Sequence, residues 1–171
     1  MSFNVEEMFR GMEKATMSQG GQYVKGEGKF LCLSKGFKVS DGHNGKFLHF
    51  EFEVLESTSP DDPVGCTRSK SIKWVESNKY KYSDAKAILF ALLGKDPKRV
   101  PSPEADPKLH LHVTQLLGAA LDPAYAAKIN MSPDDLIDIP IGLTTWKKTK
   151  RDGGPFTMHD WYPSEQPAAG G

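Results

Sequence analysis

Large apolar residues occupy every second position of the segment 46–55, namely Leu48, Phe50, Phe52 and Val54. The positions between them hold Phe47, His49, Glu51 and Glu53. A period of two predicts an antiparallel strand with one buried face. The preceding turn, residues 40–45, contains both Asp-Gly and Asn-Gly, which are strong hairpin signals. We therefore expect this strand to pair with the long extended stretch 23–39, in which Gly26, Gly28 and Gly36 mark bulges or coiling.

After a third predicted strand, residues 66–75, the pattern becomes helical. Ser83 is a suitable N-cap for a helix over 85–93, which ends at Gly94. Asp106-Pro107 begins a second helix, whose apolar stripe is Leu109, Val113, Leu116, Leu117 and Ala120. Residues 109–113 also alternate, so a short strand is an alternative there. A third helical piece, 123–129, and a turn capped by Ser132-Pro133 follow.

Residues 141–163 read as a closing hairpin, because two β-prone arms flank a Gly-rich turn. The order is therefore three strands, a helical insertion and two strands. This is the order of the OB-fold, a five-stranded Greek-key barrel with a helix between strands three and four. We expect an N-terminal helical arm over 1–19, an OB-fold domain over 20–163 with the insertion at about 83–138, and a disordered tail over 164–171.

Composition narrows the class of protein. A chain of 171 residues suits one domain with its own core. No apolar run approaches the roughly 20 residues that a membrane span needs, and the first twelve residues lack the apolar region of a secretory signal. Cys32 and Cys66 form no disulfide framework or metal-binding pair, which indicates a cytoplasmic protein. Basic and acidic residues number 22 each, so any nucleic-acid site must be local.

The sequence offers no convincing catalytic or cofactor motif. The stretch from Gly21 to Gly26 resembles a phosphate loop only in its glycine spacing, because Glu27 follows it where a lysine is required. His110 and His112 lie about 200° apart on a helix and cannot share a metal ion. We therefore predict a protein that is not an enzyme and that uses no metal or cofactor.

Basic and aromatic residues instead interleave on the strands that would line a binding groove. The candidate phosphate-binding residues are Arg68, Lys70, Lys73, Lys147, Lys148 and Lys150. The candidate platforms for bases are Phe47, Trp74, Trp146 and Trp161. Cations for phosphates and flat rings for bases are what a single-stranded nucleic acid needs. A solvated basic edge strand over a partly buried tryptophan would be the structural alternative. Phe156 and Met158 are better read as core than as contacts.

The chain also resembles the OB-fold single-stranded DNA-binding proteins encoded by bacteriophages. Residues 20–30, 45–57, 65–69, 82–86 and 153–163 carry this resemblance. It implies a coat for unwound DNA in replication or recombination, tolerant of sequence, without a cofactor and often self-associating. Bacterial relatives end in an acidic tail, whereas this sequence ends in Ser-Glu-Gln-Pro-Ala-Ala-Gly-Gly, which argues against recruiting replication or recombination proteins through that end.

Two other functions remain open from the sequence. One is a non-catalytic interaction module, such as a replisome or virion adaptor, that uses the N-terminal helix and the insertion. The other, less favoured, is an enzyme such as a nuclease subunit. The prediction that we carry forward is sequence-tolerant binding of single-stranded DNA, without a membrane and without a cofactor.

Overall fold

The computed structural model describes residues 23–42, 45–149 and 153–164. The expected N-terminal arm, Lys150 and nearly all of the expected tail lie outside these residues. The fold is mainly β, as predicted, and its helices stand between the third and fourth strands. The strands are β1 (Gly28–Gly42), β2 (Gly45–Ser57), β3 (Thr67–Trp74), β4 (Pro140–Thr149) and β5 (Pro155–Pro163). The helices are α2 (Lys81–Leu92), η1 (Pro97–Arg99), α3 (Pro107–Leu121), α4 (Pro123–Lys128) and η2 (Pro133–Leu136).

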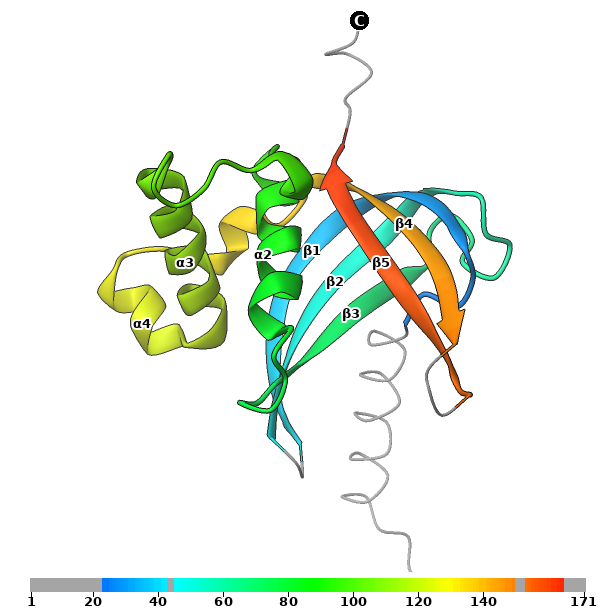
Figure 1. The fold of residues 1–171 in the computed structure, drawn as a ribbon, viewed down its shortest axis with the longest axis horizontal. Coiled ribbons are helices and arrows are strands. Elements are labelled where there is room, and N and C mark those ends of the chain that lie inside the picture. The colour runs from blue at the N-terminus through cyan, green and yellow to red at the C-terminus, as the bar shows by residue number, and fades with distance from the viewer. Residues whose placement is uncertain (1–22, 43–44, 150–152, 165–171) are drawn as a thin grey trace, which may run out of the picture.

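The strands form one curled antiparallel sheet in the order β3-β2-β1-β4-β5 (Figure 1). The long strand β1 pairs with β2 along its length and with β4 through its first half. This ladder shifts register near Gly36, which has a φ of +95°, so the bulge predicted at that glycine is confirmed. Because β1 pairs with β2 on one side and with β4 on the other, it lies in the middle of the sheet. The edge strands of the sheet are β3 and β5.

The alternation predicted for β2 is confirmed. Its apolar positions are all fully buried: Leu48, Phe50, Phe52 and Val54. Trp161 of β5 meets two of these rings edge-on, with centroids 5.5 Å from Phe50 and 5.4 Å from Phe52. Cys32 lies in the same core, and burial raises the pKa of its thiol to about 12. A thiol with that pKa is inert at neutral pH, as expected of a small core residue.

The helices stand together beside the sheet, and α2 is the one nearest to β5 in Figure 1. Two details differ from the sequence prediction. First, α2 begins at Lys81 after Tyr80, which makes no side-chain cap, so Ser83 lies inside the helix and the predicted cap is wrong. Second, residues 109–113 are helical, so the alternative strand is wrong. The predicted cap at Asp106 is confirmed, because its carboxylate accepts a hydrogen bond from the Leu109 N–H at 3.2 Å.

Candidate nucleic-acid interface

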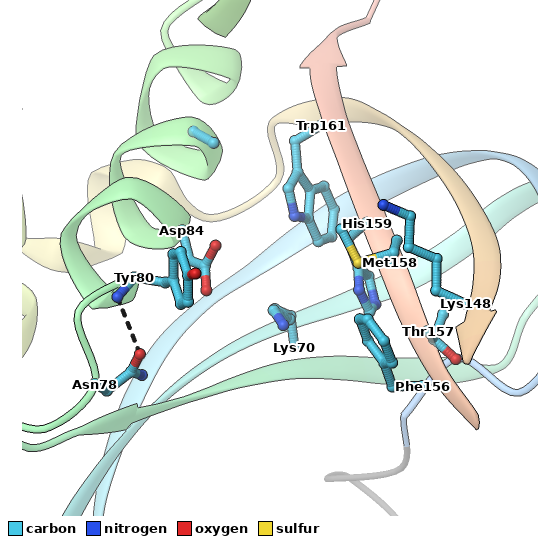
Figure 2. A pocket seen from close by; sticks show the side chains of 11 residues that line it. Lys70, Asn78, Tyr80, Asp84, Lys148, Phe156, Thr157, Met158, His159 and Trp161 are labelled. Atoms are coloured by element: carbon cyan, nitrogen blue, oxygen red, sulfur yellow. Dashed lines mark hydrogen bonds between the residues drawn. The ribbon is translucent and has the colours of Figure 1, made fainter. Parts of the chain in front are cut away.

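The two edge strands of the sheet border a cavity of about 490 Å³ (Figure 2). Its walls come from β3, from the first turns of α2 with the loop before it, and from the β4–β5 hairpin. The lining residues are Lys70, Asn78, Tyr80, Asp84, Ala87, Lys148, Phe156, Thr157, Met158, His159 and Trp161. A smaller cavity of about 220 Å³ shares Lys70, Thr157 and His159 with it. The edges of the sheet are therefore separated by a hollow with polar and aromatic walls.

Lys70 is directed toward this hollow by the register of the sheet. It lies opposite the fully buried Phe50, and directly opposed residues of an antiparallel pair share one face. Asp84 approaches from α2, where it stands in the first turn. Burial raises the pKa of the Asp84 carboxyl, and the charge of Lys70 partly opposes that rise. A cation and a carboxyl thus line one cavity.

His159 adds a neutral imidazole to the same wall. Burial, assisted by the positive charge of Lys70, lowers the pKa of His159 to about 4. Its ring stacks on Trp161, with centroids 6.0 Å apart and planes 14° apart. Both ring nitrogens are buried, and neither has a side-chain hydrogen-bond partner within residues 23–42, 45–149 and 153–164. At neutral pH this ring is therefore uncharged, and its nitrogens are shielded from solvent.

One lip of the cavity is an aromatic corner between β3 and α2. Trp74 meets Tyr82 edge-on at 5.3 Å, and the Lys81 ammonium lies 5.4 Å and 5.2 Å from the centroids of these two rings. Tyr80 is 61% exposed, and its backbone N–H donates to the Asn78 Oδ1 at 3.1 Å. Asn78 in turn donates from its Nδ2 to the Lys73 carbonyl at 2.8 Å. The corner is thus fixed by hydrogen bonds and leaves its rings open to solvent.

The other lip is the β4–β5 hairpin. Trp146 is 36% exposed, and Lys147 and Lys148 beside it are exposed. In register, Trp146 lies opposite Met158 and Lys148 lies opposite Phe156. The Lys147 N–H donates to the Glu27 carboxylate at 2.7 Å, which holds the strand while its side chain stays exposed. Trp146 and Lys148 therefore lie on one face of the hairpin and Lys147 on the other, and of the three only Lys148 lines the cavity.

Two of the predicted contact residues are corrected by their burial. Arg68 is only 5% exposed, and its Nε donates to the Asp62 carboxylate at 2.8 Å, so its charge is already matched inside the protein. Trp161 is 4% exposed and packs among Phe50, Phe52 and His159, so it presents no open face to a base. Neither residue is retained as a surface contact.

The structure separates the remaining predicted residues into two groups. Lys70 and Lys148 line the cavity, whereas Trp74 lies in the corner between β3 and α2, and Trp146 and Lys147 lie on the β4–β5 hairpin. Phe47 and Lys73 lie opposite each other on the other face of the sheet, where Phe47 stacks on His49 at 6.0 Å. Lys150 lies outside the described residues. Phe156 and Met158, read as core from the sequence, are half-buried and line the cavity.

Sequence reasoning left several cavity residues out of the predicted site. Tyr80 and Tyr82 belong to the run Lys79-Tyr80-Lys81-Tyr82, whose alternation of cations and rings was a usable signal. Asp84 and His159 gave no such signal, because they are 75 residues apart and meet only through the fold. An acidic residue in the first turn of a helix would ordinarily be read as a favourable partner of the helix dipole.

No protein-family model and no curated protein matches this sequence. Within the described residues, no group of three or more histidine, cysteine, aspartate or glutamate side chains is placed to hold a metal ion. In that same part of the chain, no helix has the length and apolar character needed to cross a membrane. The case for a function therefore rests on the geometry of the cavity and its lips.

Proposed function

We propose that this protein binds single-stranded DNA, without strong sequence preference, across the cavity between β3 and β5. The observation that carries the proposal is the presence of solvent-exposed rings beside cations on both lips. Tyr80 and Tyr82 stand with Lys79 and Lys81 on one lip, and Trp146 stands with Lys147 and Lys148 on the other. Stacking on such rings contributes about 1–3 kcal/mol per base and tolerates any base.

We further propose that the curled sheet is an OB-fold barrel that remains partly open between β3 and β5. The sheet order, with β1 pairing both β2 and β4 and the helices between β3 and β4, supports this assignment. OB-folds bind oligonucleotides on the face of strands two and three and on the loops that flank it, including the turn between strands four and five. The proposed site includes β3 and the β4–β5 hairpin, which belong to that surface, and adds the loop before α2. A coat for unwound DNA would serve replication or recombination without catalysing a reaction.

The test is equilibrium binding of a fluorescently labelled oligo(dT), followed by anisotropy over a series of salt concentrations. We expect binding whose log affinity falls linearly with log salt, with a slope of about −0.7 per neutralised phosphate. The site variant combines Trp146→Ala, Lys147→Ala and Lys148→Ala. The matched control combines Leu111→Ala, Lys108→Ala and Lys128→Ala, which remove one exposed apolar side chain and two cations from α3 and α4.

The site variant should lose most of the affinity and the control should keep it. If both variants bound oligo(dT) with the same affinity, the β4–β5 hairpin would not be part of the binding site. No binding by the unmodified protein at low salt and micromolar concentration would contradict the function and favour an interaction module.

A further inference from the structure

The cavity between β3 and β5 is large enough for a small molecule, and its walls contain charged and polar groups. Its volume of about 490 Å³ lies within the range of about 300–1,000 Å³ that small-molecule sites occupy. Surface stacking explains the exposed rings on the lips, but it does not require a hollow with buried polar groups. The cavity therefore suits a ligand group that is separate from the bases stacked on the lips.

Opposite charges line this cavity without meeting each other. Lys70 and Asp84 both face it, yet neither side chain forms a hydrogen bond or an ion pair with another of the described residues. Elsewhere the chain pairs such groups closely, as with Arg68 and Asp62 at 2.8 Å. A cation and a carboxylate held apart in a half-buried hollow leave a donor and an acceptor for a third group.

The other walls of the cavity favour a flat, heteroaromatic occupant. Tyr80 and Phe156 bring rings from opposite sides, and Met158 adds apolar surface. Figure 2 shows Asp84 and Tyr80 on the α2 side, His159 and Phe156 on the β5 side, and Lys70 between them. The His159 ring belongs to the same wall, although its nitrogens are shielded from solvent. Rings around a polar centre fit a nucleobase.

We propose that the cavity accepts one guanine base of the bound strand, with Asp84 and Lys70 reading its Watson–Crick edge. Guanine presents two neighbouring N–H donors, N1–H and N2–H, to the two oxygens of a carboxylate, and its O6 accepts from an ammonium. Cytosine and adenine offer a carboxylate only an amino group, and thymine a single ring N–H between two carbonyls. Lys148 at the mouth of the cavity is placed to meet the phosphate of the inserted nucleotide. This inference rests on the proposed binding of single-stranded DNA.

The test uses four labelled oligonucleotides, each a dT tract whose central nucleotide is dT, dG, dA or dC. We expect the dG-containing strand to bind roughly tenfold more tightly than the other three, because a site built around hydrogen-bonding groups discriminates against partners that leave them unpaired. Asp84→Asn should abolish this gain, so that the dG-containing strand binds this variant no more tightly than the all-dT strand does. Lys70→Met should reduce the gain, as a second variant at a different wall. Glu56→Gln, at an exposed position of β2, is the matched control and should preserve it.

Each outcome decides one of the two proposals. Equal affinity for all four strands would overturn the guanine site and leave the single-stranded DNA function intact, and a preference for dA or dC would overturn the assignment to guanine. If no strand binds, the proposed function fails, and calorimetric titration with free dGMP then tests the cavity by itself. Binding of dGMP that Asp84→Asn removes would support the cavity as a guanine site, whereas absence of dGMP binding would overturn it.

Discussion

Two neighbouring cations on the same face of β3 have very different surroundings. Arg68 is buried against Asp62, which accepts hydrogen bonds from the Arg68 Nε, the Lys25 and Gly26 N–H groups and the Ser59 hydroxyl, at 2.8–2.9 Å. Lys70, two residues further on, shares a hollow with Asp84 and forms no such bond within the described part of the chain. Arg68 is thus matched by Asp62 within the protein, whereas Lys70 and Asp84 line one cavity without a hydrogen bond to each other.

The pKa directions of the two carboxyl groups reflect this difference. Burial alone would raise the pKa of Asp62, but the hydrogen bonds from Arg68, the two backbone amides and Ser59 outweigh it and leave the pKa below its ordinary value of 3.8. For Asp84, burial raises the pKa and the charge of Lys70 only partly opposes it. Hydrogen bonds therefore outweigh burial at Asp62, whereas no hydrogen bond does so at Asp84, the carboxyl that we propose for the binding site.

The largest expected effect comes from breaking the satisfied pair. Asp62→Asn should lower the free energy of unfolding by about 3–5 kcal/mol, because it leaves the buried guanidinium of Arg68 without its counter-charge. Urea denaturation measures this change. Asp61→Asn, at the exposed neighbouring position, should stay within about 0.5 kcal/mol of the unmodified protein. If Asp62→Asn lowered the free energy of unfolding by less than about 1 kcal/mol, the Arg68–Asp62 pair would not be a major source of stability.

The pH dependence of stability should report the environment of His159. Its pKa is about 4 in the folded protein against 6.5 ordinarily, so the unfolded chain binds the proton first as pH falls. Stability is therefore full above pH 6.5 and is lost between pH 6.5 and pH 4, by at most about 3.4 kcal/mol. The Asp62 contribution, by contrast, is lost only below pH 3.8.

The His159 contribution is isolated by comparing unfolding at pH 7.5 and pH 4.5 in the unmodified protein and in His159→Gln. The difference between the two conditions should be smaller in the variant, while His49, whose pKa burial also lowers, contributes equally to both. An unchanged difference would mean that His159 is solvated in the folded protein.

Exposed rings on the lips should affect DNA binding and leave stability almost unaltered. Trp146→Ala and Tyr80→Ala should each weaken binding of oligo(dT) by about 1–3 kcal/mol, and each should change the free energy of unfolding by about 0.5 kcal/mol or less. Leu111→Ala, at a similarly exposed site on α3, should change neither quantity. Equal affinities in all three variants would contradict stacking on the lips.

The smallest effect concerns the salt dependence. Lys147→Ala and Lys148→Ala should each reduce the slope of log affinity against log salt by about 0.7, because each removes one phosphate contact. Anisotropy titrations at four or five salt concentrations give this slope. The double variant Lys108→Ala and Lys128→Ala should keep the original slope, and a loss of slope in that control would indicate a diffuse electrostatic effect.

Local patterns were sufficient to predict much of the fold. The alternation in β2, the turn signals before it and the Asp106-Pro107 cap all depend on neighbours in the sequence, and the structure confirms each of them. The start of α2 was predicted wrongly, because Ser83 looks like a cap although the chain becomes helical two residues earlier. Capping propensity alone does not reveal that the turn at Asn78, whose side chain bonds the Tyr80 N–H, sets the start of the helix at Lys81.

The candidate site was only partly predictable for a related reason. Trp146, Lys147 and Lys148 are adjacent in sequence and remain together on one lip. The burial of Arg68 depends on Asp62, and the cavity that receives Lys70 depends on Asp84 and His159, and neither arrangement leaves a local trace in the sequence. Burial of Trp161 likewise depends on Phe50 and Phe52, more than a hundred residues away in the chain.

The most direct test of the central claim is the tryptophan fluorescence of Trp74→Phe titrated with unlabelled oligo(dT) at low and at high salt. This variant retains Trp146 on the lip and Trp161 in the core, so a change in emission on binding reports the exposed ring. We expect saturable quenching at low salt that weakens at high salt and disappears in Trp74→Phe with Trp146→Phe. Emission that stays constant at low salt and micromolar protein would contradict a nucleic-acid interface at the β4–β5 hairpin.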